Sequence, residues 1–408
     1  MKNLEKLRVD FPILDQKIRD HQLIYFDNAA TAQMPQAAIN AMVAYYTTYK
    51  SNVDRGLYSF AEKTTLHYEQ SREKIAQFIG AQASEVVFTS GATDGINMVA
   101  RIWAAHNLQA GDEIIISQIE HHSNFLPWQQ LAEEKNLILT ILPIDAQGLL
   151  DMMTFYAALS ERTKLVAIVH TSNILGTTND IGSIVAAAHQ VGAKVLVDAA
   201  QSIAHQKVDV VELDCDFLVF SGHKLYGPTG IGCLFIKKDI QPSCYPYKFG
   251  GSMVYSAGYE ESYWKNAPYC FEAGTPPIAQ AIGLGAVVDY LNNNIDFAAV
   301  AAHEHALVAR TVAGLQELGF QVLPSFAKAS ADTPGIESGH LVTFYDTDVH
   351  GHDVAMYLDS YGIAVRAGNH CVQPYHEKIG LESTVRVSFA FYNTMAEVEK
   401  FLEVMASL

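Results

Sequence analysis

The feature that most constrains the fold is an alternation of short apolar runs, rich in β-branched residues, with helical patterns between about residue 33 and residue 236. The runs lie at residues 86–89, 114–117, 165–170, 194–198, 217–220 and 231–236. Short apolar strands separated by helices are typical of a largely parallel sheet that is covered by helices on both faces. The sequence therefore predicts the α/β fold class.

The pattern changes from about residue 296 onward. Strand-like runs at 340–345, 363–366 and 385–388 are interspersed with a helix that ends before Gly362 and a last helix that begins at Thr394. Thr394 and Glu397 form the Thr-x-x-Glu pattern of a capping box. We expect a smaller α+β domain here, and predict a large domain at 21–290 and a small one made of 1–20 with 291–408.

Composition excludes several classes of protein. The formal net charge of −17 disfavours nucleic acid as a partner, because phosphate backbones bind clustered Lys and Arg. No stretch offers about 20 uninterrupted apolar residues, and the first residues, MKNLEKLRVDFP, have no apolar run after their charges. We therefore predict a soluble cytoplasmic protein with no membrane partner.

The chain has an odd number of cysteines and no Cys-x-x-Cys pair, which argues against both a disulfide framework and a zinc site. We predict no bound metal. The five residues are Cys215, Cys233, Cys244, Cys270 and Cys371.

Polar residues follow five of the expected strands, at 91–93, 120–122, 172–173, 198–201 and 221–224. Ligands of parallel sheets bind beyond the carboxyl ends of the strands, so these residues are the first candidates for a site.

Lys224 is the most informative of these candidates. It lies in SGHKLYGPTGIG (221–232), where a neighbouring cation such as His223 would lower its pKa and make it a nucleophile for an aldehyde. Asp198 would hold the proton of a pyridinium nitrogen. Thr93 opens a helix whose free N–H groups suit a phosphate. Together they predict pyridoxal 5'-phosphate (PLP) as a Schiff base on Lys224. Taken alone, Lys224 could be a surface lysine, and Asp198 and Thr93 could each be the N-cap of a helix.

The chain resembles the class V, fold-type I PLP enzymes, and more narrowly the group II cysteine desulfurases, to which SufS and CsdA belong. The motifs that carry this resemblance are YFDNAATAQMP (25–35), SGATDGIN, EHHSNFLPW (120–128), HTSNILGT (170–177), VDAAQS, SGHKLYGPTGIG, FEAGTPP (271–277), YGIAVRAGNHCVQP (361–374) and VRVSFAFYN (385–393). The resemblance implies a mostly parallel central sheet flanked by helices, with a smaller α+β C-terminal domain.

It also implies roles for residues around the cofactor. His121 is expected to stack on the pyridine ring and to take part in catalysis, Gln201 to bond the ring hydroxyl, and Asn173 to face the substrate or the ring. Thr275 is expected to reach the phosphate of the neighbouring subunit, which implies a homodimer. The remaining phosphate ligands would be Ala92, Thr93, Ser221 and His223.

Arg386 is expected to bind the α-carboxylate of the substrate, because a planar guanidinium binds a carboxylate through two hydrogen bonds; a structural salt bridge is the rival interpretation. Arg366 is a second candidate for substrate binding. Cys371, in RAGNHC, would act as a thiolate, which requires partial exposure and a positive environment. Arg366 and His370 are its expected cationic neighbours.

The predicted function is conversion of L-cysteine to L-alanine, with Lys224 as the base that removes the Cα proton and Cys371 as the residue that receives the sulfur. A SufE- or SufU-like acceptor would take this sulfur for iron–sulfur cluster assembly. The alternatives are a selenocysteine or cysteine sulfinate lyase, a class V aminotransferase, and a catalytically silent scaffold subunit.

Three positions depart from the family. Asp54 and Asn369 stand where histidine is common, and Ala199 stands where glycine is common. Asp54 is expected to affect substrate handling or its pH dependence, whereas Asn369 removes one titratable group beside Cys371. His350 and His352 are candidates for an acceptor surface, with helix capping as the alternative, whereas Cys244 and Cys270 have no assigned role.

Overall fold

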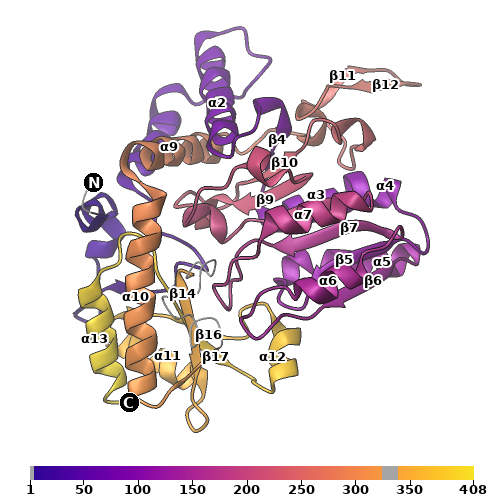
Figure 1. Ribbon diagram of the computed structural model, residues 1–408. Helices are drawn as coiled ribbons and strands as arrows, with labels where there is room; N and C mark the ends of the chain where they lie inside the picture. Colours follow the sequence, from indigo (N-terminus) through magenta and orange to yellow (C-terminus); the bar gives the residue numbers. More distant parts are fainter. Residues whose placement is uncertain (1–3, 324–338) are drawn as a thin grey trace.

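In the computed structural model, which describes residues 4–323 and 339–408, a seven-stranded sheet forms the centre of the larger part of the molecule (Figure 1). The strands from β9 to β6 run parallel, and β10 is antiparallel to both of its neighbours. The α/β class and the mostly parallel sheet are thus confirmed. In spatial order the strands are β4 (Val86–Thr89), β10 (Gly232–Ile236), β9 (Phe217–Ser221), β8 (Lys194–Asp198), β7 (Thr163–Val169), β5 (Glu113–Ser117) and β6 (Ile138–Leu142).

The strands of this sheet bury alternate side chains on opposite faces. In β8, Val195 and Val197 lie in one apolar core, and Leu196 lies in the other. The first core is covered by α2 (Ser59–Phe78), α6 (Met152–Ala158), α7 (Ile181–Gln190) and α9 (Ile278–Asn294), with α1 (Gln36–Ala44) and α8 (Val210–Leu213) beside them. The second is covered by α3 (Ala92–Val99), α4 (Ala105–Asn107) and α5 (Leu126–Lys135). Burial on both faces explains the continuous apolar runs of the sequence.

Strand β6 is the one member of this sheet that the sequence analysis missed. It lies at the sheet edge, pairs only with β5, and leaves Ile138 and Ile141 exposed. Of its five residues only Leu142 is buried, so this strand lacks the continuous burial that marks the other strands and its pattern is weaker.

A second, antiparallel sheet belongs to the C-terminal part, with strand order β13 (Gln321–Val322), β14 (Leu341–Tyr345), β17 (Thr384–Ser388) and β16 (Arg366–Gly368). Four helices accompany it: α10 (Phe297–Glu317), α11 (Gly351–Ser360), α12 (Gln373–Ile379) and α13 (Met395–Met405). A smaller C-terminal α+β unit is therefore present, as expected. The capping box at the start of α13 is confirmed, because Thr394 Oγ1 accepts the N–H of Glu397 and Glu397 Oε2 accepts the N–H of Thr394.

The run at 363–366 was expected to form one strand and forms two. Strand β15 (Ile363–Ala364) pairs in parallel with β3 (Ile24–Tyr25), and β16 joins β17 in the second sheet. The chain changes partner at Val365 because β3, from the N-terminal region, supplies an edge that the local sequence cannot reveal.

Two further strand pairs lie apart from these sheets. A hairpin of β11 (Val254–Ala257) and β12 (Ser262–Trp264) projects from the larger part, at the upper right of Figure 1. Strands β1 (Lys17–Ile18) and β2 (His21–Gln22) form a short pair near the N-terminus.

The N-terminal segment contacts both parts of the molecule. Arg8 donates to the carbonyl of Tyr392 over 3.2 Å and pairs with Glu397 at 2.9 Å, whereas the Phe11 ring lies 6.3 Å from that of Tyr226. The assignment of residues 1–20 to the small domain stays a prediction. So does the division at residue 290, which falls within α9.

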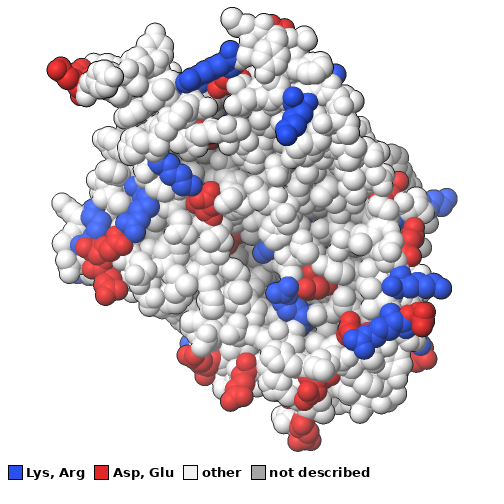
Figure 2. Space-filling model, turned by 180° about the vertical axis from the view of Figure 1, so that it is seen from behind, with Lys and Arg blue, Asp and Glu red and all other residues white. Residues whose placement is uncertain are grey.

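Across the part of the chain that the structure describes, none of the helices is long and apolar enough to cross a membrane. Lys and Arg lie among Asp and Glu in small mixed groups on the face seen in Figure 2, and no single large patch of one sign covers that face.

Candidate active site

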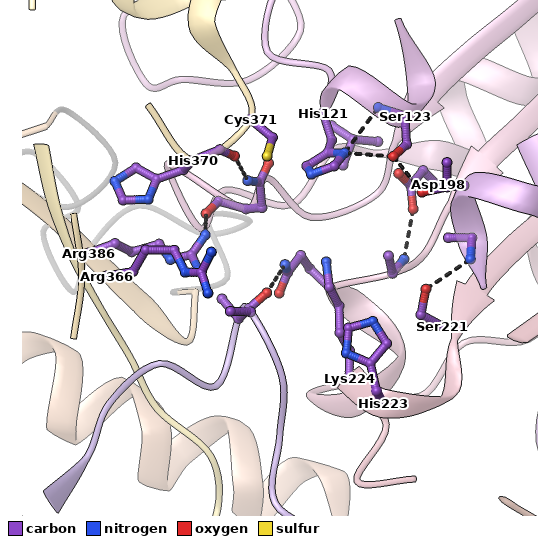
Figure 3. Close-up of a pocket in the computed structure, with 18 residues that line it drawn as sticks. His121, Ser123, Asp198, Ser221, His223, Lys224, Arg366, His370, Cys371 and Arg386 are labelled. Carbon is purple, nitrogen blue, oxygen red and sulfur yellow. Dashed lines mark hydrogen bonds between the residues drawn. The ribbon is translucent and has the colours of Figure 1, made fainter. Parts of the chain in front are cut away.

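A cavity of about 250 Å³ lies beyond the carboxyl ends of β8 and β9. Figure 3 shows the central sheet contributing Lys224, Asp198 and His121, and the C-terminal part contributing Arg366, Cys371 and Arg386. Nearly all of the predicted site residues line it: Ala92, Thr93, His121, Asn173, Asp198, Gln201, Ser221, His223, Lys224, Arg366, Cys371 and Arg386.

Thr275 is the exception among the predicted residues. It is exposed outside this cavity, where its hydroxyl accepts a hydrogen bond from Asn52 Nδ2 at 3.4 Å. Its expected role in a neighbouring subunit stays a prediction.

Lys224 ends the short 3-10 turn Gly222–Lys224 that follows β9. Desolvation inside the cavity lowers the pKa of its amine to about 8, with smaller contributions from Arg386 and Arg366, while Asp198 opposes the shift. The pKa of Lys224 is thus lowered, as expected, but His223 is not the cation that lowers it. Burial lowers the pKa of His223 to about 4, so its ring is neutral near pH 7.

Asp198 is the last residue of β8 and is buried. Its Oδ1 accepts the N–H of Ala200 at 2.9 Å. Desolvation raises the pKa of its carboxyl group, and the neighbouring Lys224 lowers it. The cavity therefore holds one acid and one amine that each favour the charged form of the other.

The start of α3 forms one end of the cavity. Gly91, with φ +153°, turns the chain from β4 into the helix, and Ala92 donates its N–H to Ser221 Oγ at 2.8 Å. The Thr93 hydroxyl lies 2.7 Å from that of Ser123. Ser123 also lines the cavity and was not assigned from the sequence, although it lies in the EHHSN motif. Main-chain donors and hydroxyl groups at a helix N-terminus suit an anion.

His121 caps the turn that follows it. Its Nδ1 accepts the N–H of Ser123 at 3.1 Å, which leaves Nε2 as the protonated nitrogen of the neutral ring. Burial, reinforced by Lys224, lowers the pKa of His121 to about 3. The site therefore contains a neutral imidazole ring at physiological pH.

Arg366 and Arg386 share the carboxylate of Asp27. Arg366 Nη2 lies 3.1 Å from Asp27 Oδ2, and Arg386 Nη2 lies 3.4 Å from Asp27 Oδ1. Asp27 belongs to the quoted YFDNAAT motif but was not assigned a role, because its two partners are more than 300 residues away in sequence.

Arg386 retains unused hydrogen-bonding capacity. Its side chain is buried, Nη1 donates to the carbonyl of Asn173 at 2.8 Å, and Nε has no hydrogen-bond partner among the described residues. Desolvation lowers the pKa of Arg386 to about 10, which still leaves it charged at neutral pH. A structural salt bridge, the rival interpretation of Arg386, therefore accounts for one nitrogen of the guanidinium group, Nη2, which pairs with Asp27.

Cys371 is exposed, in contrast to the other four cysteines, which are buried. Desolvation raises the pKa of Cys244 to about 12 and that of Cys270 to about 11, which makes both thiols poor nucleophiles. His370 was expected to be a cationic neighbour of Cys371, and that prediction was wrong. Its ring is buried, its pKa is lowered well below the usual value by burial, and its Nε2 lies 2.9 Å from the Thr384 hydroxyl.

Two amide side chains, those of Gln201 and Asn173, also line the cavity. Gln201 Nε2 donates to the carbonyl of Ala29 at 2.9 Å, and its Oε1 lies 3.1 Å from His340 Nε2. Asn173 Nδ2 donates to the carbonyl of His370 at 2.8 Å, whereas its buried Oδ1 has no partner in the part of the chain that the structure describes.

The positions that depart from the family make local contacts. Asp54, with φ +74°, pairs with Lys265 at 3.3 Å. Asn369 Oδ1 accepts the N–H of Cys371 at 3.2 Å, and Ala199 is fully buried.

The two histidines proposed for an acceptor surface lie at the start of α11. His350 caps this helix, with its Nδ1 accepting the N–H of His352 at 3.3 Å. The capping interpretation accounts for His350, and a role at an acceptor surface stays a prediction.

Comparison with known proteins adds to this geometry. Residues 24–401 match the model of the family described as Aminotransferase class-V. A relative from Halalkalibacterium halodurans, named probable cysteine desulfurase, is 45% identical over 399 residues, which span 97% of this chain and 96% of the relative.

Two solved structures are also similar. The apo structure of a cysteine desulfurase from Thermococcus onnurineus NA1 has a TM-score of 0.93 and 38% identity, covering 100% of this chain and 98% of that one. The Escherichia coli cysteine desulfurase CsdA, in a form described as S-sulfonic acid, has a TM-score of 0.90 and 35% identity, with the same coverage. The chain therefore belongs to the aminotransferase class-V family and is a homologue of the cysteine desulfurases.

Proposed function

We propose that this protein is a PLP-dependent cysteine desulfurase that converts L-cysteine to L-alanine and holds the sulfur as a persulfide on Cys371. The observation that carries the proposal is the presence of an exposed cysteine in the same cavity as Lys224, Asp198 and Arg386. The homologues named cysteine desulfurases support it.

The residues of the cavity fit PLP. Lys224 supplies an amine for covalent attachment, and Asp198 supplies a carboxylate for the ring nitrogen. Ser221 has its oxygen occupied by the N–H of Ala92, so its own proton remains free for an anion at the α3 end. When bound, PLP makes the Cα proton of an attached amino acid acidic, because the protonated ring withdraws electrons.

Lys224 is suited to both amine and base chemistry. With a pKa of about 8, an appreciable fraction of its side chain is neutral near pH 7, whereas an ordinary lysine is almost wholly charged. A neutral amine can attack an aldehyde and later accept a proton from Cα. The neutral His121 ring supplies a flat aromatic surface without competing for that proton.

Two side chains that line the cavity have polar atoms without a partner among the described residues, and both suit an amino-acid substrate. Arg386 Nε is a buried donor, and Asn173 Oδ1 is a buried acceptor. A buried polar group without a partner costs about 1–3 kcal/mol, so a ligand that satisfies both is stabilised. A substrate carboxylate would bond Arg386, and an N–H or O–H donor would bond Asn173.

Cys371 completes the reaction. Its thiolate attacks the sulfur of the substrate, so that an S–S bond forms as the Cβ–S bond breaks. The electron pair of the broken bond returns to the carbon skeleton, which takes up a proton and leaves as alanine. Because Cys371 is exposed, an acceptor protein can then reach its persulfide. Delivery to a SufE- or SufU-like acceptor for iron–sulfur cluster assembly is part of this proposal.

The proposal includes a homodimer and a cytoplasmic location, and one observation supports each. Thr275 lies outside its own cavity, which supports a homodimer in which it serves the neighbouring site. All five cysteines are unpaired, as expected for the reducing cytoplasm.

The experiment that tests the function compares the wild type with Cys371→Ala after both are supplied with PLP. We expect both proteins to show the visible absorption of bound cofactor and only the wild type to form alanine from cysteine. Alanine formation by Cys371→Ala at the wild-type rate would overturn the persulfide proposal. Turnover by that variant confined to selenocysteine or cysteine sulfinate would instead favour a lyase.

A further inference from the structure

The loop that carries Cys371 is held from the other side of the cavity by His122, a residue without an assigned role. The N–H of His122 donates to the carbonyl of Cys371 at 2.8 Å. The N–H of Gln373 donates to His122 Nε2 at 3.1 Å. One histidine therefore binds the main chain on both sides of Val372.

The conformation of this loop requires such support. His370 and Cys371 have φ values of +50° and +60°, a region that is unfavourable for residues with a Cβ atom. Within the loop, Asn369 accepts the N–H of Val372 at 2.8 Å and that of Cys371 at 3.2 Å. Further main-chain bonds come from the other side, from His122 and from Asn173, whose Nδ2 donates to the carbonyl of His370, while the carbonyl of Val372 accepts the N–H of His376 at 3.3 Å.

His122 is itself fixed to the central sheet. It begins the turn His122–Asn124, which the buried carboxyl group of Glu120 anchors. Glu120 accepts from Ser117 Oγ at 2.6 Å, from the N–H of Val169 at 3.1 Å and from Asn124 Nδ2 at 2.7 Å. The position of His122 is therefore set by β5 and β7, the strands that also set the position of the cavity.

We propose that His122 is a positioning residue that holds the Cys371 loop against the central sheet and so places the Cys371 thiol for sulfur transfer. The inference rests on the proposed function. It assigns His122 no contact with substrate or cofactor, and it requires Nε2 to remain an acceptor.

This requirement adds a pH dependence. Burial lowers the pKa of His122, so the ring accepts a hydrogen bond at neutral pH. Protonation at acid pH would set an N–H against the N–H of Gln373 and release the loop. Other titratable or charged groups around this turn are Cys371, His121, whose ring centre is 6.3 Å away, Glu120, which bonds Asn124 of the same turn, and the ion pair of Arg101 with Glu134 in the adjoining cleft. Burial lowers the pKa of His121 to about 3, so that ring stays neutral at mildly acid pH.

The test uses the PLP-loaded enzyme with two substitutions, His122→Gln and His122→Leu. The glutamine carbonyl oxygen extends to about the position of Nε2 and accepts a hydrogen bond but does not titrate, whereas leucine offers no acceptor. Gln373→Ala is the matched control, because its side chain bonds Glu377 and only its main chain contacts His122.

We expect His122→Leu to lower kcat for alanine formation by about 10- to 100-fold, the range for a reacting group displaced by about 1 Å, with cofactor absorbance and KM unchanged. The rate of Cys371 alkylation should change in the same variant. His122→Gln should restore kcat and remove the loss of activity on the acid side that the wild type shows. Gln373→Ala should resemble the wild type.

A wild-type kcat in His122→Leu, an equal loss in both His122 variants, or loss of cofactor absorbance would each overturn the positioning role. These outcomes are distinct from failure of the proposed function, which would appear as absence of persulfide in the wild type itself.

Discussion

Lys224 and Asp198 line one cavity, and each shifts the pKa of the other toward its charged form. Desolvation acts in the opposite direction on both groups and is the larger effect on each. The amine therefore has a pKa low enough for chemistry near neutral pH, and it also keeps an anionic neighbour. The proposed cofactor would use both groups, the amine for attachment and the carboxylate for the ring nitrogen.

Asp198→Asn should remove that anionic neighbour while keeping the size of the side chain. We expect alanine formation to fall at least about thirtyfold, since loss of a buried charged partner typically costs about 2–5 kcal/mol. Asp198→Glu, which keeps the charge, should retain more activity. Steady-state rates together with the absorbance of bound cofactor test this, and unchanged turnover in Asp198→Asn would remove Asp198 from the mechanism.

Arg386→Lys should keep the positive charge but lose the planar pair of donors. We expect KM for cysteine to rise by about 10- to 100-fold, because a hydrogen bond to a charged group contributes about 1.5–3 kcal/mol, with little change in cofactor absorbance. Arg310→Lys is the control, because it makes the same change in a surface ion pair with Glu399. An equal KM in all three proteins would leave Arg386 as a structural residue.

Buried histidines should make the protein sensitive to acid. Burial lowers the pKa of His170 to about 4 from its ordinary 6.5, so below pH 6.5 the unfolded chain binds a proton that the folded chain does not. The free energy of unfolding therefore falls as pH decreases from 6.5 toward 4, by up to about 1.4 kcal/mol per pH unit for this residue.

His170→Gln removes that titration. Between pH 6.5 and 4.5 the variant should lose about 2–3 kcal/mol less stability than the wild type, measured by urea unfolding. Identical pH slopes for the two proteins would show that His170 is not held neutral in the folded state.

The location of Thr275 predicts complementation between subunits. If Thr275 serves the neighbouring site, a heterodimer of a Lys224→Ala subunit and a Thr275→Val subunit contains one complete site. We expect this heterodimer to have about half of the wild-type activity and wild-type affinity for PLP at the site that keeps Lys224, whereas the Thr275→Val homodimer should bind PLP about tenfold more weakly, as for one lost hydrogen bond. Weak PLP binding at the site that keeps Lys224 would place Thr275 in its own subunit's site.

The inner strands and the residues that follow them could be predicted because their signals are local. The expected run at 194–198 coincides with β8, and Asp198 stands at its end, where ligands of parallel sheets bind. The capping box of Thr394 and Glu397 is likewise encoded within four residues. An inner strand can be predicted from its continuous run of buried residues, and a capping box can be predicted from the fixed spacing of its two residues.

Features that depend on distant contacts could not be predicted. Asp27 acquires its role only where β3, β16 and β17 bring it to Arg366 and Arg386. The charge states of His223 and His370 are set by burial, which a sequence neighbourhood rich in polar residues does not reveal. The contact of His122 with the Cys371 loop joins residues 251 positions apart.

The most direct test of the account is mass spectrometry of the PLP-loaded protein after brief exposure to L-cysteine without an acceptor or reductant. The account predicts that the peptide containing Cys371 gains the mass of one sulfur atom, that this mass is lost on reduction, and that the peptides of the four buried cysteines are unchanged. Alanine formation with no added sulfur on Cys371, or with added sulfur on another cysteine, would contradict it.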